Sequence, residues 1–214
     1  LSPKTATLRV VEVVSETSDT KTFRLDNSSG AIPSHRPGQF AGVCVTIEGC
    51  EAWRNFTISS SPTQHEFLDL TVKRSPLGKV SKALHDSITA GSALKIRAPQ
   101  GAFYFDPDRH TEPLVLISAG SGITPMISIL RYLADHGSDL PCLFLYGART
   151  VADIIFQKEC AALAKRMANL RYVVSLSLPP RDLNGFVGRI DFSLVQELVV
   201  NIRGSRDILC GPGD

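Results

Sequence analysis

The hydrophobic and polar positions of this chain follow two different patterns, and the change falls near its middle. In the first half, short segments rich in Val, Ile, Thr and Phe recur at roughly 8–15 residues, with turn residues between them. Such spacing is typical of an antiparallel barrel or sandwich. The segments expected as strands are 5–15, 20–25, 42–47, 54–59, 67–74 and 93–98, and one short helix is expected over 79–85.

In the second half, short apolar runs alternate with segments of helical spacing. Strand–helix alternation predicts a parallel sheet with helices on both faces. The polar, proline-containing segment 106–113 separates the two patterns, so we expect domains at 1–108 and 109–214. The expected strands are 114–118, 143–146, 172–176 and 207–210, and the expected helices are 125–136, 155–167 and 193–200.

The segment 114–125 reads as a buried strand, a glycine turn and a helix start. Gly120 and Gly122 form the turn, Thr124 suits a helix N-cap, and Pro125 suits the first helical position. This arrangement brings free backbone N–H groups and a positive helix end to one point, which favours a phosphate. An ordinary turn without a ligand is the alternative, because two spaced glycines are a weak signal.

Two other segments follow expected strands at the same edge of the sheet. Arg149 follows the second strand, where an arginine can hold a 2′-phosphate or lie over an adenine ring. The alternative for Arg149 is a solvated loop residue. Cys210 opens a sharp Cys-Gly-Pro-Gly turn after the last strand, and its alternative is a buried small thiol before a loop.

The richest polar segment of the first half begins at Arg54 and reads RNFTISS. Strand alternation points Arg54, Phe56 and Ile58 to one face, and Thr57 and Ser59 to the other. A cation, an aromatic ring and hydroxyl groups together suit an anionic, planar ligand. A strand with a packed phenylalanine is the alternative interpretation.

Composition and charge exclude several classes of function. The formal net charge is +2 without a basic run, which argues against nucleic acid as a partner, and no apolar run approaches the roughly 18 residues of a membrane span. The five cysteines form no C-x-x-C pair, so no metal site is expected, and the odd count indicates reduced thiols in a cytoplasmic compartment. Hydrolase motifs such as G-x-S-x-G are absent. Because the chain begins without Met, we expect a fragment or a processed form.

Taken together, the motifs resemble those of the ferredoxin–NADP reductase superfamily. RNFTISS resembles its flavin motif R-x-Y-S/T-x-x-S, GSGITP resembles its pyridine-nucleotide loop, and CGP resembles its nicotinamide turn. The segments VKR at 72–74, GKVS at 78–81, PGQF at 37–40 and GAF at 101–103 also match, in the family's order. The resemblance implies a six-stranded antiparallel Greek-key β-barrel that binds flavin. A parallel-sheet α/β domain for NAD(P) follows, and its usual last helix and strand are missing here.

The resemblance also implies a reaction, that of an NAD(P)H-dependent flavoprotein oxidoreductase. Hydride passes from NADH or NADPH to bound FAD, and electrons then pass singly to an iron–sulfur or haem acceptor. FAD is favoured over FMN because the element 78–81 suits a second phosphate, and NADH is favoured because Arg149 stands without a basic cluster. A [2Fe–2S] cluster is expected only in a fused or partner ferredoxin domain. A non-catalytic flavin-binding electron-transfer subunit and a free flavin reductase are the alternatives.

Residue roles follow from the same resemblance. Arg54 is expected to neutralise a flavin phosphate, and Phe56, in place of the family's Tyr, to stack on the ring. Thr57 and Cys210 are the expected catalytic residues, beside flavin N5 and the nicotinamide. The other residues expected to bind the cofactors are Ile58, Val72, Lys73, Gly78, Lys79, Val80, Ser81, Gly120, Gly122, Thr124, Arg149, Gly211 and Pro212.

Overall fold

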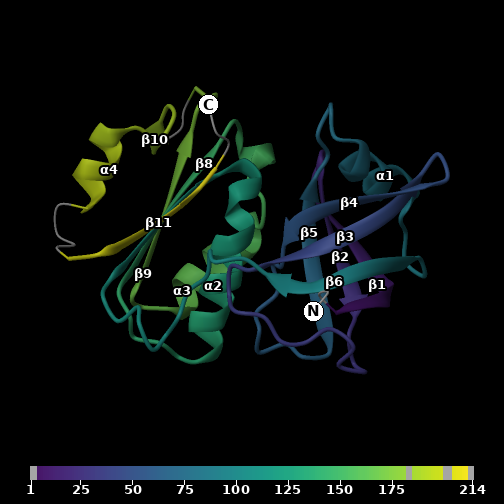
Figure 1. Cartoon of the computed structure of the whole chain (residues 1–214). Helices are drawn as coiled ribbons and strands as arrows, with labels where there is room; N and C mark the ends of the chain where they lie inside the picture. The colour runs from purple at the N-terminus through teal and green to yellow at the C-terminus, as the bar shows by residue number, and fades with distance from the viewer. Residues whose placement is uncertain (1–3, 182–184, 200–203, 212–214) are drawn as a thin grey trace. The chain divides into compact units, whose positions relative to one another are not determined.

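The structure is a computed structural model that describes residues 4–181, 185–199 and 204–211 (Figure 1). It divides into two compact units, Leu1–Phe105 and Asp106–Asp214. The division expected after residue 108 falls within the polar segment that follows Phe105. Each unit is described below by itself.

The first unit is built on one antiparallel sheet with the strand order β4-β3-β6-β1-β2-β5. A backbone bridge between Ile58 and Leu70 joins the β4 end of this sheet to β5, which closes the sheet into a barrel. The six-stranded antiparallel fold predicted from the sequence is confirmed. The elements are β1 (Thr5–Thr17), β2 (Thr20–Asp26), β3 (Phe40–Ile47), β4 (Cys50–Thr57), β5 (Phe67–Lys73), α1 (Lys79–Ser87) and β6 (Ala93–Gln100).

The barrel core is formed by alternate residues of each strand. On β3, the inward residues Ala41 and Val43 are fully buried, and they pair with Phe56 and Arg54 of β4. Directly opposed residues of antiparallel strands share a face, so Arg54 and Phe56 lie on the same side of β4, as the alternation predicted. Phe56 packs against the barrel core, whereas Arg54 is exposed.

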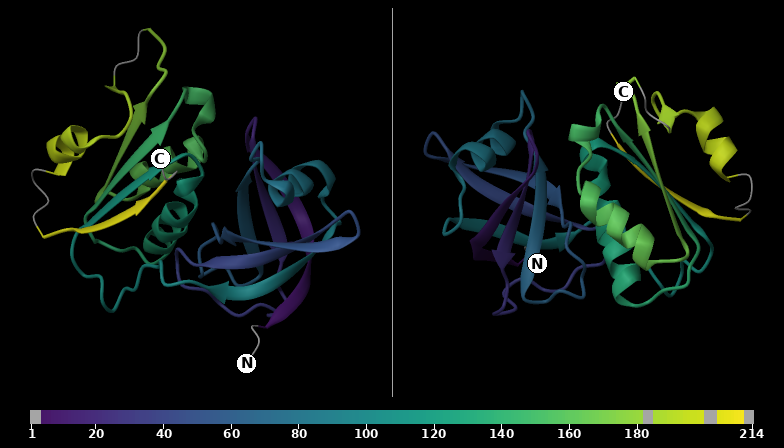
Figure 2. Two further views of the ribbon diagram at one scale, coloured as in Figure 1. Left: turned by 45° about the horizontal axis from the view of Figure 1, so that its top comes forward. Right: turned by 180° about the vertical axis from the view of Figure 1, so that it is seen from behind.

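The second unit is a five-stranded, all-parallel sheet with the strand order β10-β9-β8-β7-β11. Helices α2 and α3 lie on one face of it and α4 lies on the other (Figure 1 and Figure 2), which confirms the predicted α/β arrangement. The elements are β7 (Leu114–Ala119), η1 (Gly120–Gly122), α2 (Ile123–Asp135), β8 (Cys142–Ala148), η2 (Val151–Asp153), α3 (Gln157–Arg166), β9 (Leu170–Leu176), β10 (Phe186–Val187), α4 (Phe192–Val199) and β11 (Arg206–Cys210).

The start of α2 differs from the prediction. The turn η1 continues directly into the helix, and Gly122 takes the position of the N-cap with helical angles (φ −62°, ψ −9°). Thr124 is therefore not the N-cap, because its hydroxyl lies within the first turn and donates to the carbonyl oxygen of Ser121 at 3.0 Å. Pro125 also lies inside the first turn, where the missing N–H needs no partner.

Of the helices in the described ranges, none combines the length and the apolar character needed to cross a membrane.

Candidate cofactor and nucleotide sites

The carboxyl end of β4 presents a cation, an aromatic ring and a hydroxyl group. The Arg54 guanidinium donates to the carbonyl oxygen of Trp53 at 2.8 Å, and within the described part of the chain it makes no ion pair. Phe56 and Thr57 are partly buried, and the Thr57 hydroxyl makes no hydrogen bond to any described residue. These groups remain able to bind an anionic ligand with an aromatic ring.

The turn before α1 is shaped as a site for an anion. Gly78 precedes the helix with extended angles, no side chain caps the first turn, and no acidic residue lies in it. The backbone N–H groups of the first turn therefore carry the positive end of the helix without a side-chain partner. A Cβ atom on Gly78 would lie 2.6 Å from Ser81 Oγ and 3.0 Å from Ser75 Cβ, so a side chain at this position would displace one of these two serines. A phosphate fits the first turn of α1 on these grounds.

The Ser81 hydroxyl has a different use from the one expected. It donates to the Gly78 carbonyl oxygen and accepts from the Ser75 N–H, each at 3.1 Å. Its single proton is therefore used inside the turn, and in this arrangement it has none to donate to a phosphate. Ser81 shapes the turn, and the backbone N–H groups of Lys79, Val80 and Ser81 are left to bind an anion.

Three of the expected flavin-binding residues have buried side chains. Ile58, Val72 and Val80 all lie in the barrel core, with exposed fractions of 3% or less. Their side chains cannot reach a ligand on the barrel surface, so only their main chains can contribute. Lys73 remains on the surface, where its ammonium group lies 3.2 Å from a carboxylate oxygen of Asp19.

In the second unit, the glycine turn and the end of the last described strand lie against each other. Gly120 has a left-handed backbone (φ +52°), and β11 pairs with β7 so that Cys210 lies opposite Ser118. A Cβ atom on Gly122 would overlap the carbonyl oxygen of Cys210 and would lie 3.0 Å from Gly211 Cα. The fold therefore brings both expected nucleotide-binding turns together at the carboxyl edge of the sheet, where such sheets bind their ligands.

Arg149 and Cys210 lie at the same edge of this sheet. Arg149 is exposed after β8, and its side chain makes no hydrogen bond or ion pair with any described residue. Cys210 is half-buried, and this burial raises the pKa of its thiol, which therefore stays protonated at neutral pH. Pro212, the last of the expected site residues, lies outside the described residues.

Sequence reasoning missed Tyr146, which the structure places at the nucleotide turn. Its side chain is fully buried, and its hydroxyl donates to the carbonyl oxygen of Gly120 at 3.1 Å. From the sequence alone, a tyrosine inside an apolar strand cannot be distinguished from an aromatic residue that only packs in the core. The single available signal was its place directly before Gly147, at the carboxyl end of that strand.

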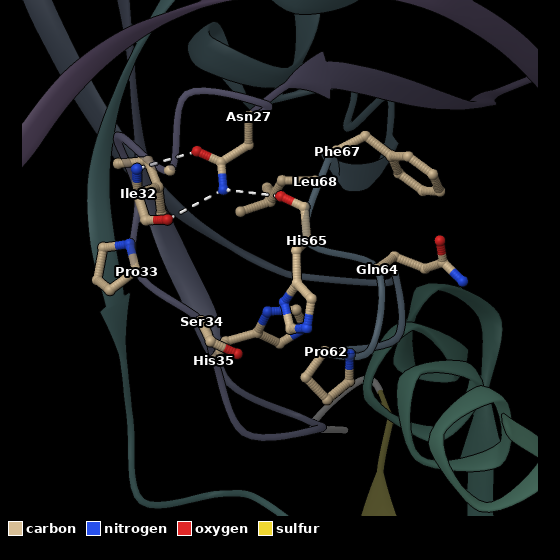
Figure 3. Close-up of a pocket in the computed structure, with 11 residues that line it drawn as sticks. Asn27, Ile32, Pro33, Ser34, His35, Pro62, Gln64, His65, Phe67 and Leu68 are labelled. Atoms are coloured by element: carbon tan, nitrogen blue, oxygen red, sulfur yellow. Dashed lines mark hydrogen bonds between the residues drawn. The ribbon is translucent and has the colours of Figure 1, made fainter. Parts of the chain in front are cut away.

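A separate pocket of about 220 Å³ lies in the barrel unit (Figure 3), and its lining includes none of the residues expected to bind flavin. His35 Nε2 donates to the Ser60 carbonyl oxygen at 3.1 Å, and burial lowers the pKa of His35 to about 4. His35 is therefore neutral at pH 7. The pocket is lined by Asn27, Gly30, Ile32, Pro33, Ser34, His35, Pro62, Gln64, His65, Phe67 and Leu68.

Comparison with protein families and with known proteins identifies both halves of the chain. Residues 5–105 match the oxidoreductase FAD-binding domain, and residues 116–214 match the oxidoreductase NAD-binding domain. The glycine betaine monooxygenase reductase subunit of Chromohalobacter salexigens is 31% identical over 208 residues, which cover 96% of this chain and 56% of that protein. The flavohemoprotein of Oceanobacillus iheyensis is 32% identical, and the match covers 95% of this chain and 52% of that protein.

Solved structures share the fold. The cytochrome P450 reductase of Amycolatopsis superimposes with a TM-score of 0.84 at 28% identity, over 99% of this chain and 63% of that one. The FAD/NAD-binding domain of a nitric oxide dioxygenase from Vibrio cholerae gives a TM-score of 0.81 at 23% identity, over 99% of this chain and 100% of that one. The chain spans about half the length of the curated relatives it matches. From its barrel, its parallel sheet and these two matching domains, the chain belongs to the ferredoxin–NADP reductase superfamily of flavoprotein oxidoreductases.

Proposed function

We propose that this chain is the flavin- and nucleotide-binding part of an NAD(P)H-dependent oxidoreductase. It takes hydride from NAD(P)H into bound FAD and passes electrons singly to an iron–sulfur or haem acceptor. The observation that supports this most is that each unit carries its own glycine turn suited to a phosphate. The first leads into the uncapped end of α1, and the second lies against Cys210.

On the barrel, different residues bind the phosphates and the flavin ring of the cofactor. Arg54 and the N–H groups at the start of α1 bind the phosphates, because a planar cation and a helix N-terminus both favour an anion. Phe56 packs against the flavin ring, and the Thr57 hydroxyl donates to it. The chemistry that FAD supplies when bound is acceptance of a hydride and release of its electrons one at a time.

On the parallel sheet, the turn from Gly120 to Thr124 binds the dinucleotide phosphates. Gly122 allows this turn to approach the main chain at Cys210 and Gly211, and those residues border the nicotinamide. Hydride transfer depends on close approach and alignment, so a neutral thiol at this edge fills space without adding charge. Arg149 faces the adenosine end, and NADH is the favoured donor because Arg149 has no second cation in its own segment.

The acceptor is proposed from the chemistry of the relatives. The glycine betaine and propane 2-monooxygenase relatives are named as reductase components, and the flavohemoproteins are named for haem. We therefore place the acceptor in a [2Fe–2S] ferredoxin-type or haem domain, fused to this chain or separate from it. All five cysteines are free thiols, which supports a reducing, cytoplasmic compartment.

The proposal is tested by an anaerobic visible spectrum of the purified protein, before and after stoichiometric NADH and then NADPH. We expect flavin absorption bands that one of the two nucleotides bleaches. A colourless protein that also fails to take up added FAD would contradict the flavin site. Flavin bands that neither nucleotide bleaches would contradict the reductase activity and leave a flavin-binding electron-transfer protein.

Replacing Cys210 by alanine is expected to slow flavin reduction roughly ten- to a hundredfold while flavin stays bound, because the side chain that borders the nicotinamide is lost. Stopped-flow absorbance under anaerobic conditions measures the rate. Cys142→Ala is the matched control, since Cys142 is a buried thiol at the opposite, amino end of β8. Equal rates in Cys210→Ala and the wild type would make Cys210 a packing residue.

A further inference from the structure

Two hydroxyl groups hold consecutive carbonyl groups of the nucleotide turn. Tyr146 donates to the carbonyl oxygen of Gly120 at 3.1 Å, and Thr124 donates to the carbonyl oxygen of Ser121 at 3.0 Å. The N–H of Ile123 also points at these two oxygens. Both carbonyl groups are thereby directed toward the protein's own donors.

The direction of a carbonyl group fixes the direction of the next N–H group. A trans peptide is planar, and its C=O and N–H bonds point in opposite directions. The bond from Tyr146 to Gly120 therefore turns the Ser121 N–H away from Tyr146. The Ser121 N–H is the donor that this peptide offers to a phosphate, whereas the Gly122 N–H closes the 3₁₀ turn onto the carbonyl oxygen of its N-cap, Ala119.

Gly120 allows the peptide that joins it to Ser121 to change its orientation easily. It stands in the left-handed region at φ +52°, and a Cβ atom there would meet nothing within 4 Å. Glycine occupies positive and negative φ about equally well, so the peptide plane between Gly120 and Ser121 can rotate at low cost. A hydrogen bond from a fixed donor, in addition to the one from the Ile123 N–H, then favours one orientation of this peptide.

Tyr146 is such a fixed donor. Its side chain is fully buried, its ring centroid lies 6.1 Å from that of Phe144, and its backbone pairs with Ser118 of β7. The hydroxyl thus reaches the turn from the neighbouring strand, on a ring with only two rotatable bonds. Thr124 belongs to α2 itself, whereas Tyr146 links this turn to the neighbouring strand β8.

We propose that Tyr146 is a positioning residue for the pyridine nucleotide, because it presets the Gly120–Ser121 peptide so that the Ser121 N–H faces the phosphate. This inference rests on the proposed function. When only a fraction of molecules has the binding-competent turn, the apparent dissociation constant rises by the reciprocal of that fraction. Tyr146 therefore acts on nucleotide affinity and leaves the hydride-transfer step itself unchanged.

The test compares Tyr146→Phe with the wild type in binding of the oxidised nucleotide, measured by calorimetry without turnover. Loss of one hydrogen bond is expected to raise the dissociation constant by about tenfold. KM for the reduced nucleotide is expected to rise in parallel, with kcat changed less than about twofold. Tyr172→Phe is the matched control, because its hydroxyl on β9 is buried and makes no hydrogen bond to the turn.

The outcomes separate this inference from the proposed function. Equal affinity in Tyr146→Phe and the wild type would overturn the positioning role while the proposed function stands. A wild type that binds neither nucleotide would overturn both. A fall in melting temperature and flavin content larger than that of Tyr172→Phe, together with a lowered kcat, would show a general structural role and contradict the proposal.

Discussion

Gly122→Ala is expected to lower nucleotide affinity roughly a hundredfold, because a displaced turn loses hydrogen bonding to a charged phosphate, which is worth about 1.5–3 kcal/mol. A Cβ atom on Gly122 would lie 2.6 Å from the carbonyl carbon of Cys210, and this neighbour is backbone. It cannot rotate away as a side chain can, since β11 is paired with β7 up to Cys210 itself. The turn and the strand end must move apart, at a cost of about 1–3 kcal/mol in the free energy of unfolding.

Calorimetric binding of the oxidised nucleotide and thermal unfolding measure the two effects of Gly122→Ala. Gly211→Ala is the control for the unfolding measurement alone, because a Cβ atom there would lie 3.7 Å from the Ala119 nitrogen, an ordinary van der Waals contact. We expect Gly211→Ala to unfold like the wild type. Wild-type behaviour of Gly122→Ala would show that the turn does not lie against Cys210 in solution.

The fold was predictable from the sequence because the hydrophobic positions follow a regular strand or helix spacing within most elements. Alternation on β3 and β4 placed Arg54 and Phe56 on one face, and the pairing of these strands confirms it. The strand at Phe186–Val187 was missed because two residues cannot show a period of two. The N-cap assigned to Thr124 was wrong because η1 and α2 run together, which residue preference alone does not reveal.

The candidate site was only partly predictable, since a motif does not say which atoms remain free. Val72 and Val80 stand within matching motifs, yet their side chains belong to the barrel core. The Ser81 hydroxyl is used within its own turn. These outcomes depend on tertiary packing and local hydrogen bonds, and the same is true of Tyr146, whose role at Gly120 arises from a neighbouring strand.

Arg54→Ala is expected to weaken FAD binding by about 1.5–3 kcal/mol, the usual loss for a hydrogen bond to a charged group. This corresponds to a dissociation constant raised roughly ten- to 150-fold. The guanidinium is exposed, and its one hydrogen bond in the described part of the chain goes to the Trp53 carbonyl, so its charge is available to a phosphate. Titration of the flavin-free protein with FAD, followed by fluorescence, measures the change.

Arg9→Ala controls for loss of a surface charge, because Arg9 is an exposed arginine of the same barrel and lies 3.7 Å from Asp26. Its removal is expected to leave FAD affinity unchanged. Arg54→Lys is expected to recover part of the affinity, since lysine keeps the charge but not the planar pair of donors. The difference between Arg54→Ala and the wild type should shrink at high salt, which screens exposed charges. An Arg54→Ala variant that binds FAD like the wild type would remove Arg54 from the site and leave the first turn of α1 to bind the phosphates.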